Sequence, residues 1–187
     1  MLKRTFDLLL SLLLLVLFSI PLLIVALLVR LTSPGPILYW SERVGRYNKN
    51  FYMPKFRSMR IDTPQVATHL LGDAQNFLTP IGSFLRKSSL DELPQLFSVI
   101  TGDMSFVGPR PALFNQDDLI ELRTQKNVHE LRPGITGWAQ INGRDELPIP
   151  TKVEFDVYYR NHAPFFLDLK ILFLTFFKVF KADGVQH

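Results

Sequence analysis

A long apolar stretch near the amino terminus is the strongest pattern in the chain. From Leu8 to Val29, 22 consecutive residues carry no charged side chain. A helix of about 20 apolar residues is long enough to cross the hydrocarbon core of a bilayer. The stretch is too long for a cleaved signal peptide and shows no evident small-residue cleavage site. The pattern therefore predicts a helix embedded in a membrane.

Ser19-Ile20-Pro21 interrupts this stretch near its middle, and a proline inside a helix removes one backbone hydrogen bond and kinks the helix. Basic residues flank the stretch on both sides, with Lys3 and Arg4 before it and Arg30 after it. Positive residues favour the cytoplasmic side of a membrane. A helix that bends at Pro21 and returns to the same face satisfies both flanks, whereas an ordinary kinked span places one flank outside. The residues alone leave these two topologies about evenly matched.

A mixture of short elements follows the breaker cluster at residues 32–36. The pattern predicts extended segments at residues 37–40 and 50–53 and helices at residues 91–100 and 116–130. It also predicts a partly irregular polar segment at residues 62–79 and rigid loops at residues 108–111 and 132–137. Such a mixture predicts an α+β fold. We expect a membrane helix-break-helix over residues 1–31 and a small mixed globular domain with short strands over residues 32–187.

A second strongly apolar segment follows Pro164, which suits the first turn of a helix. Asp168, Lys170 and Lys178 interrupt this segment, and these charges argue against a second membrane span. An amphipathic interfacial helix over about residues 164–181 is the favoured interpretation, with its lysines reaching toward lipid headgroups. A buried core helix is the alternative.

Charge is unevenly distributed in this chain of 187 residues with a formal net charge of +4. Residues 30–87 contain nine Lys or Arg and three acidic residues, whereas residues 88–187 are net negative. The basic half suits anionic lipid headgroups or a polyphosphate ligand. A membrane anchor would keep the protein away from nucleic acid, so nucleic acid is not expected as a partner. The absence of cysteine fits a reducing compartment.

Two adjacent carboxylates, Asp91 and Glu92, follow Arg86 and Lys87 at a predicted helix start. Ser89 and Glu92 have the spacing of a capping box, and a start at Asp91 would instead place the following proline in the first turn. Either start puts Asp91 at the positive end of the helix dipole, which favours its ionised form. An ionised carboxylate there can act as a nucleophile or a metal ligand, although most such motifs only begin a helix.

Several cations have both a structural and a substrate-binding interpretation. Arg110 lies between two prolines, which restrict its backbone, and an arginine fork matches phosphate oxygens. Lys55 and Arg57 could line one strand face, and residues 142–144 could form a turn with a solvated arginine. No single motif is specific, but together they indicate cations that converge on an anionic substrate.

The sequence offers little for a transition metal. Without cysteine, and with histidines at 69, 129, 162 and 187 that lack metal-ligand spacing, a zinc site is not expected. A hard cation held by carboxylate and substrate phosphate is more plausible, and Mg²⁺ binds in that way. Neither of the glycine-rich nucleotide-binding motifs is present, so ATP and dinucleotides lack support.

Seven blocks of the chain carry a more specific signal, at residues 3–7, 55–59, 88–96, 102–111, 132–144, 155–159 and 167–171. In this order they resemble the bacterial sugar transferase family, and in particular its small monotopic phosphoglycosyl transferases. The blocks cover nearly the whole chain, which makes the conjunction far more specific than any single motif. One departure is that Ile20 separates Ser19 from Pro21, the two residues assigned to the membrane break, whereas small members often have them adjacent.

The resemblance implies a two-step reaction. Asp91 would attack the β-phosphate of a UDP-sugar, release UMP and pass the covalent phosphosugar to polyprenyl (undecaprenyl) phosphate. Glu92, together with Asp91, would hold Mg²⁺. The candidate substrate-binding residues are Lys55, Arg57, Arg86, Arg110, Asn142 and Arg144.

The resemblance also implies a monotopic protein on the cytoplasmic face of the bacterial inner membrane, in contact with phospholipid. It would catalyse the first membrane step of glycoconjugate or polysaccharide assembly. Downstream glycosyltransferases and a second copy of the chain are further candidate partners. The alternative is a non-enzymatic, membrane-anchored scaffold that binds anionic lipid or a partner. No residue in the sequence selects the sugar.

Overall fold

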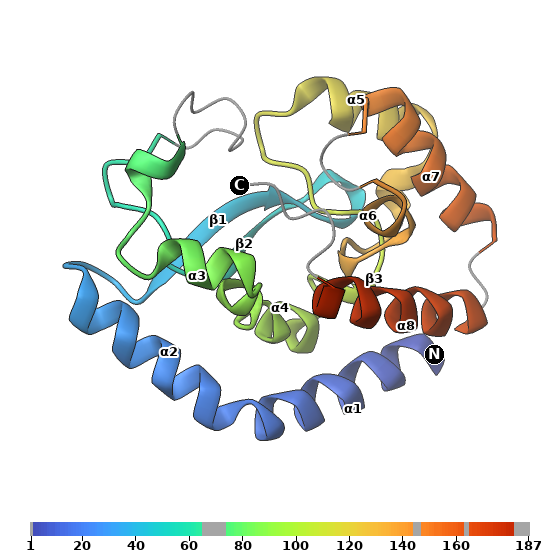
Figure 1. The fold of residues 1–187 in the computed structure, drawn as a ribbon. Helices are drawn as coiled ribbons and strands as arrows, with labels where there is room; N and C mark the ends of the chain where they lie inside the picture. The colour runs from blue at the N-terminus through green and yellow to red at the C-terminus, as the bar shows by residue number, and fades with distance from the viewer. Residues whose placement is uncertain (1, 65–73, 144–146, 163–164, 182–187) are drawn as a thin grey trace.

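The amino-terminal helices lie along one side of the globular part of the computed structural model (Figure 1), which describes residues 2–64, 74–143, 147–162 and 165–181. Helices α1 (Leu2–Leu17) and α2 (Ser19–Thr32) form an arc with a bend of 64°. Within the described residues, no single helix has the length and hydropathy needed to cross a membrane. The bent pair meets both criteria together, which is compatible with a broken span or a re-entrant loop.

Backbone chemistry at the junction of α1 and α2 explains the bend. Pro21 has no N–H, so the carbonyl of Leu17 loses the helical hydrogen bond that residue 21 would otherwise donate. The hydroxyl of Ser19 donates to the carbonyl of Val16 at 2.8 Å. Ser19 therefore takes part in the bend, even though Ile20 separates it from the proline.

The two faces of the arc differ in chemistry. Toward the globular part, Asp7 and Ser11 of α1 and Val25 and Val29 of α2 are buried. The other face exposes large apolar side chains, namely Leu9, Leu12, Leu13, Val16, Leu17, Ile20, Leu23, Ile24, Leu27 and Leu31. A continuous apolar surface of this extent marks an interaction with a membrane or another protein.

The amino-terminal end of α1 is bound to the globular part by its two cations. Lys3 Nζ donates to the carboxylate of Asp168, which is buried, at 2.6 Å. Arg4 donates to two carbonyls in the last turn of α4 (Gln95–Thr101), where helix carbonyls lack intrahelical donors. These residues, which we interpreted as a flank at the membrane surface, are therefore held in protein contacts.

The carboxyl-terminal end of α2 is bound to the globular part by Arg57, directly after strand β2 (Asn50–Phe56). The guanidinium donates to the carbonyls of Ser33 and Pro34 at 2.8 and 2.6 Å, and the side chain is buried. Gly35 has a φ of +116°, and a Cβ there would lie 2.1 Å from an Arg57 nitrogen. The turn after α2 therefore needs both the arginine and the glycine.

Two small sheets form the middle of the domain. Strands β1 (Leu38–Val44) and β2 (Asn50–Phe56) form an antiparallel hairpin, and β3 (Ser105–Val107) and β4 (Gly134–Thr136) pair in parallel. The other elements are η1 (Arg46–Asn48), η3 (Ala74–Phe77), α3 (Gly82–Lys87), η4 (Leu90–Glu92), α5 (Asp117–Gln125), η5 (Val128–Glu130), α6 (Trp138–Ile141), α7 (Ile149–Asn161) and α8 (Phe165–Lys181). The mixed α+β fold is confirmed.

Some elements differ from the sequence-based prediction. The loop expected at residues 132–137 contains β4, because its backbone pairs with β3. The helix expected at 116–130 divides into α5 and η5 at Asn127, whose φ of +57° is left-handed. Helix α7 was not predicted. Part of the polar segment 62–79 lies outside the described residues.

Helix α8 lies beside α1 under the parallel sheet (Figure 1). Ile171 is fully buried in the core, whereas other large side chains of α8 are exposed, namely Phe166, Leu169, Phe173, Phe176 and Phe177. Lys178, expected to reach toward headgroups, instead donates to the carbonyl of Ile141 at 2.6 Å. Lys170 lies over the ring of Trp138, 5.8 Å from its centroid.

We predict that the bent pair enters and leaves on one face of the membrane, because contacts with the globular part hold both its ends. A cysteine replacing Leu2 should be shielded from an impermeant thiol reagent in intact cells and labelled after lysis. The chain has no cysteine of its own, so the background is clean. Rapid labelling in intact cells would instead support a span.

Candidate active site

The two adjacent carboxylates lie in a tight turn between α3 and α4. Ser89 adopts a left-handed conformation (φ 56°), Asp91 and Glu92 follow in the 3-10 turn η4, and α4 begins only at Gln95. Neither η4 nor α4 has a side-chain cap, so the expected helix start at Asp91 and the expected capping box are wrong. Successive side chains in a 3-10 turn point about 120° apart, so the two carboxylates have different surroundings.

Glu92 lies among cations from three other segments. Lys55 Nζ donates to Glu92 Oε1 at 2.7 Å, and an Arg110 nitrogen lies 3.9 Å from the same oxygen. Burial disfavours the charged carboxylate, but the charges of Lys55, Arg110 and, least of the three, Arg43 outweigh it and lower the pKa of Glu92 to about 2. Glu92 is therefore ionised throughout the physiological pH range.

Asp91 has the opposite electrostatic character. Its side chain is largely buried, and this burial is the main reason that the pKa of Asp91 is raised to about 6. Lys55 opposes the shift, the charge of Glu92 adds to it, and Arg86 opposes it again. The sequence-based expectation that a helix dipole and cations dominate is therefore wrong. At neutral pH Asp91 is still mostly ionised, and it is more basic than an ordinary aspartate.

The predicted substrate-binding residues are distributed over several places. Lys55 and Arg110 contact Glu92, and Arg86 acts on Asp91 electrostatically. Arg57 instead binds the turn after α2, as described above. Asn142 lies at the end of α6 and donates to a backbone carbonyl of that helix at 2.7 Å. Arg144 lies outside the described residues.

Arg43 on β1 is a cation of this cluster that the sequence analysis did not select. It is among the charges that lower the pKa of Glu92, and its guanidinium donates to the Pro111 carbonyl at 3.2 Å. The hairpin register pairs Tyr39 with Lys55, so the period of two along each strand puts Arg43 and Lys55 on one face. The same alternation was visible in the sequence, but the register was not.

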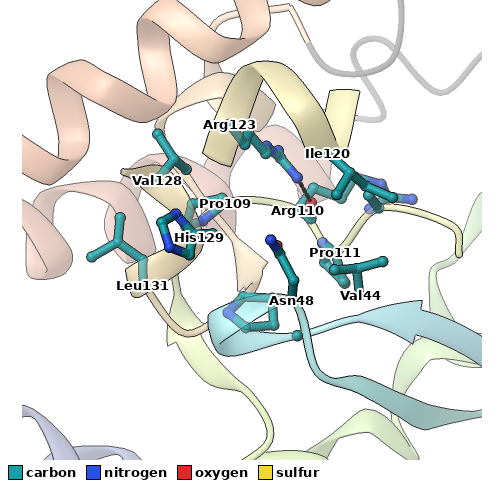
Figure 2. Close-up of a pocket in the computed structure, with 13 residues that line it drawn as sticks. Val44, Asn48, Pro109, Arg110, Pro111, Ile120, Arg123, Val128, His129 and Leu131 are labelled. Carbon is teal, nitrogen blue, oxygen red and sulfur yellow. Dashed lines mark hydrogen bonds between the residues drawn. The ribbon is translucent and has the colours of Figure 1, made fainter. Parts of the chain in front are cut away.

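A small pocket lies on one side of the loop that carries Arg110 (Figure 2). Neither Asp91 nor Glu92 lines it. The pocket is therefore separate from the carboxylates, and Arg110 connects the two places.

The donor set at the carboxylates is small. Within the described part of the chain, no three His, Asp or Glu side chains are grouped closely enough to hold a metal ion. His129 and His162 lie against Tyr47 and Tyr158, respectively. Asp91 and Glu92 alone could bind only a cation that takes its remaining ligands from substrate or water.

Comparison with known proteins gives consistent similarities. Residues 1–182 match the family model described as "Bacterial sugar transferase". The chain is 45% identical over 188 residues to EpsL of Bacillus subtilis, an uncharacterized sugar transferase, covering 100% of this chain and 91% of that protein.

Two similar proteins are named for defined reactions. The UDP-glucose:undecaprenyl-phosphate glucose-1-phosphate transferase of Escherichia coli is 43% identical over 188 residues, with 96% of this chain and 40% of that protein covered. The UDP-N-acetylgalactosamine-undecaprenyl-phosphate N-acetylgalactosaminephosphotransferase of Aeromonas hydrophila is 37% identical over 190 residues, with 98% and 45% covered. The chain thus spans less than half the length of these two relatives.

The opposite pKa shifts give a prediction for Lys55. Replacing Lys55 with methionine removes the largest charge that favours ionised Asp91, so the pKa of Asp91 should rise above about 6, by roughly one unit or more. The measurement is the ¹³C shift of the Asp91 carboxyl carbon against pH in detergent micelles, with Asp91→Asn used to assign the signal. Arg60→Met, which breaks only a surface pair with Asp62, is the control and should change nothing. An unchanged titration in Lys55→Met would contradict this account of the site.

Proposed function

The chain belongs to the bacterial sugar transferase family, and we propose that it moves a sugar-1-phosphate from a UDP-sugar to undecaprenyl phosphate and releases UMP. The observation that carries this proposal is the adjacent pair of carboxylates with cations around it. A buried, basic aspartate next to an ion-paired glutamate suits covalent phosphoryl chemistry. A membrane-anchored scaffold, the alternative, has no use for a buried carboxylate with a raised pKa.

In the first step, an Asp91 carboxylate oxygen attacks the β-phosphorus of the UDP-sugar. A bond forms between this oxygen and phosphorus, the bond from phosphorus to the bridging diphosphate oxygen breaks, and UMP leaves with the electron pair. In the second step, a phosphate oxygen of the lipid attacks the same phosphorus and releases Asp91. The raised pKa supports the role of Asp91, because a more basic carboxylate is a better nucleophile while it is still ionised at neutral pH.

The surrounding cations support charge stabilisation. Phosphoryl transfer depends mainly on alignment of the reacting groups and on neutralisation of phosphate oxygens. Lys55 and Arg110 pair with Glu92, and Arg43 and Arg86 add positive charge, so these cations already surround the carboxylates before a substrate binds. Fixed charges of this kind need little reorganisation when the transition state forms.

The carboxylates fit Mg²⁺ as a cofactor. Glu92 is ionised and carries hard oxygen donors, and its neighbour Asp91 adds two more oxygens. The set is too small for an all-protein cage, which suits a cation that takes further ligands from the diphosphate. When bound by Glu92 and Asp91, the ion would neutralise charge on the diphosphate. Lys55 and Arg110 keep Glu92 deprotonated for that role.

The lipid acceptor accounts for the bent helices. Its phosphate lies at headgroup height, so the carboxylates must lie there too. We propose a monotopic protein on the cytoplasmic face of the bacterial inner membrane, with the exposed apolar face of α1 and α2 in contact with phospholipid. Self-association and contact with downstream glycosyltransferases stay predictions from the family resemblance.

The sugar is left to experiment, because relatives of similar identity are named for different ones. Relatives between 37% and 43% identical are named for glucose, galactose and N-acetylgalactosamine. The first test is therefore a screen of UDP-sugars with undecaprenyl phosphate and Mg²⁺, with UMP release as the readout. The screen includes plain hexoses, acetamido sugars and diacetamido sugars. Release of no UMP from any UDP-sugar would reject the proposed function.

The nucleophile has a direct test. UDP-sugar and Mg²⁺ without the lipid should leave one phosphosugar on the parent protein, detected by intact-protein mass, and Asp91→Asn should show none, because an amide is a very poor nucleophile. The fold of Asp91→Asn should survive, since an amide replaces a carboxyl whose ionisation is already disfavoured. Asp62→Asn, at an exposed surface pair, is the matched control and should keep the adduct. An equal adduct on Asp91→Asn would remove Asp91 as the nucleophile.

Glu92→Gln tests the metal assignment. The change keeps the size of the side chain but removes its charge, so turnover should fall by roughly tenfold to thousandfold and more Mg²⁺ should be needed for half-maximal rate. Glu130→Gln, which breaks an ion pair on the surface, should leave both quantities unchanged. An unaltered Mg²⁺ dependence in Glu92→Gln would exclude Glu92 as a ligand.

A further inference from the structure

The loop that presents Arg110 is held at four consecutive carbonyls by donors from three different segments, namely β1, β4 and α5. The carbonyl of Pro109 accepts from the backbone N–H of Gly134 at 2.9 Å, and that of Ala112 accepts from Val44 N–H at 3.0 Å. Between them, the carbonyls of Arg110 and Pro111 accept from arginine side chains. The backbone of this loop is thus fixed along its length, in addition to the restriction from its prolines.

Arg123 supplies the hydrogen bond to the carbonyl of Arg110 itself. Its NH1 group donates to the Arg110 carbonyl at 2.8 Å, while Nε and NH2 donate to the Asp156 carboxylate at 2.9 and 2.7 Å. Arg123 is 8% exposed and Asp156 is 2% exposed. Figure 2 shows the Arg123 guanidinium directed at this carbonyl.

We propose that Arg123 and Asp156 are a positioning pair for the catalytic cluster: they hold the backbone of Arg110 so that its side chain faces Glu92. This inference rests on the proposed function for its kinetic readout. The pair joins α5 and α7 to the loop that carries Arg110. Neither of these helices carries Asp91, Glu92 or a cation of the catalytic cluster.

Geometry explains why an arginine is needed. The guanidinium has donors on two sides, so it can bind Asp156 with one side and the Arg110 carbonyl with the other. Asp156 neutralises the charge of Arg123, so the pair contributes position and little net field. Arg43 differs, because it holds the Pro111 carbonyl and also adds positive charge near Glu92.

The informative variant is Arg123→Lys. A lysine keeps the ion pair that Asp156 requires in a buried place, so the fold should persist, but its single ammonium cannot serve both partners in the same geometry. We expect kcat/KM for UMP release to fall by about tenfold to a hundredfold, mostly in kcat. In the Arg110→Ala background the same change should cost less than about twofold, because the residue being positioned is gone.

Hydrogen exchange gives a second readout that does not need activity. Exchange of the Gly134 and Val44 amides should rise in Arg123→Lys, because both donate to the loop, whereas amides of α8 should not change. Arg160→Lys, on the same helix as Asp156 but in a surface pair with Glu130, is the control and should leave activity and exchange unaltered. If Arg123→Lys does not fold, Asp156→Asn replaces it in both measurements.

The outcomes separate the two proposals. A parent protein that turns over no UDP-sugar rejects the proposed function, while the exchange measurement still tests the positioning role. Equal losses from Arg123→Lys in the parent and Arg110→Ala backgrounds would show a merely structural pair. Unchanged exchange at both loop-dependent amides would overturn the positioning role whatever the kinetics.

Discussion

The ion pair between Lys55 and Glu92, at 2.7 Å, is the contact on which the site depends. Two adjacent carboxylates with limited solvent access disfavour each other's charge, and both need a nearby cation. Lys55 is the strongest attractive charge for each, but its hydrogen bond goes to Glu92. One carboxylate is therefore kept ionised with a pKa of about 2, while the other rises to about 6. Such separation of neighbouring pKa values is how two similar groups acquire different chemical roles.

Strand β2 connects this ion pair to the bent helix pair α1 and α2. Lys55 lies near its end, and two residues later Arg57 binds the turn that follows α2. At the other end of the arc, Arg4 binds the last turn of α4, the helix that follows the carboxylates. The same short segments thus set the position of the apolar arc relative to the carboxylates. An acceptor phosphate at headgroup level is compatible with this arrangement.

The sequence predicted the parts of this site that depend on local chemistry. Asp91 and Glu92 were selected as adjacent acids that follow two cations. Arg110 was selected because it lies between two prolines, and Lys55 as a cation on one face of a predicted strand. The structure brings these residues together. The sequence did not reveal that Arg43 joins this cluster. Strand register depends on the turn at residues 47–48, where both residues adopt a left-handed backbone conformation.

Other contacts of the candidate residues could not be read from the sequence. Arg57 donates to the carbonyl of Pro34, and Asn142 donates to a carbonyl of the helix that it follows. A substrate-binding role for these two residues stays a prediction. The helix start predicted at Asp91 was wrong because Ser89 turns the chain first. The burial of Asp91 follows from that turn, and its effect on stability helps to distinguish a helix cap from a nucleophile. A carboxyl whose folded-state pKa exceeds that of the unfolded chain destabilises the fold as pH rises from about 4 to 6, by up to roughly 3 kcal/mol at neutral pH. A helix cap would gain nothing from such a cost, whereas a nucleophile gains basicity from it.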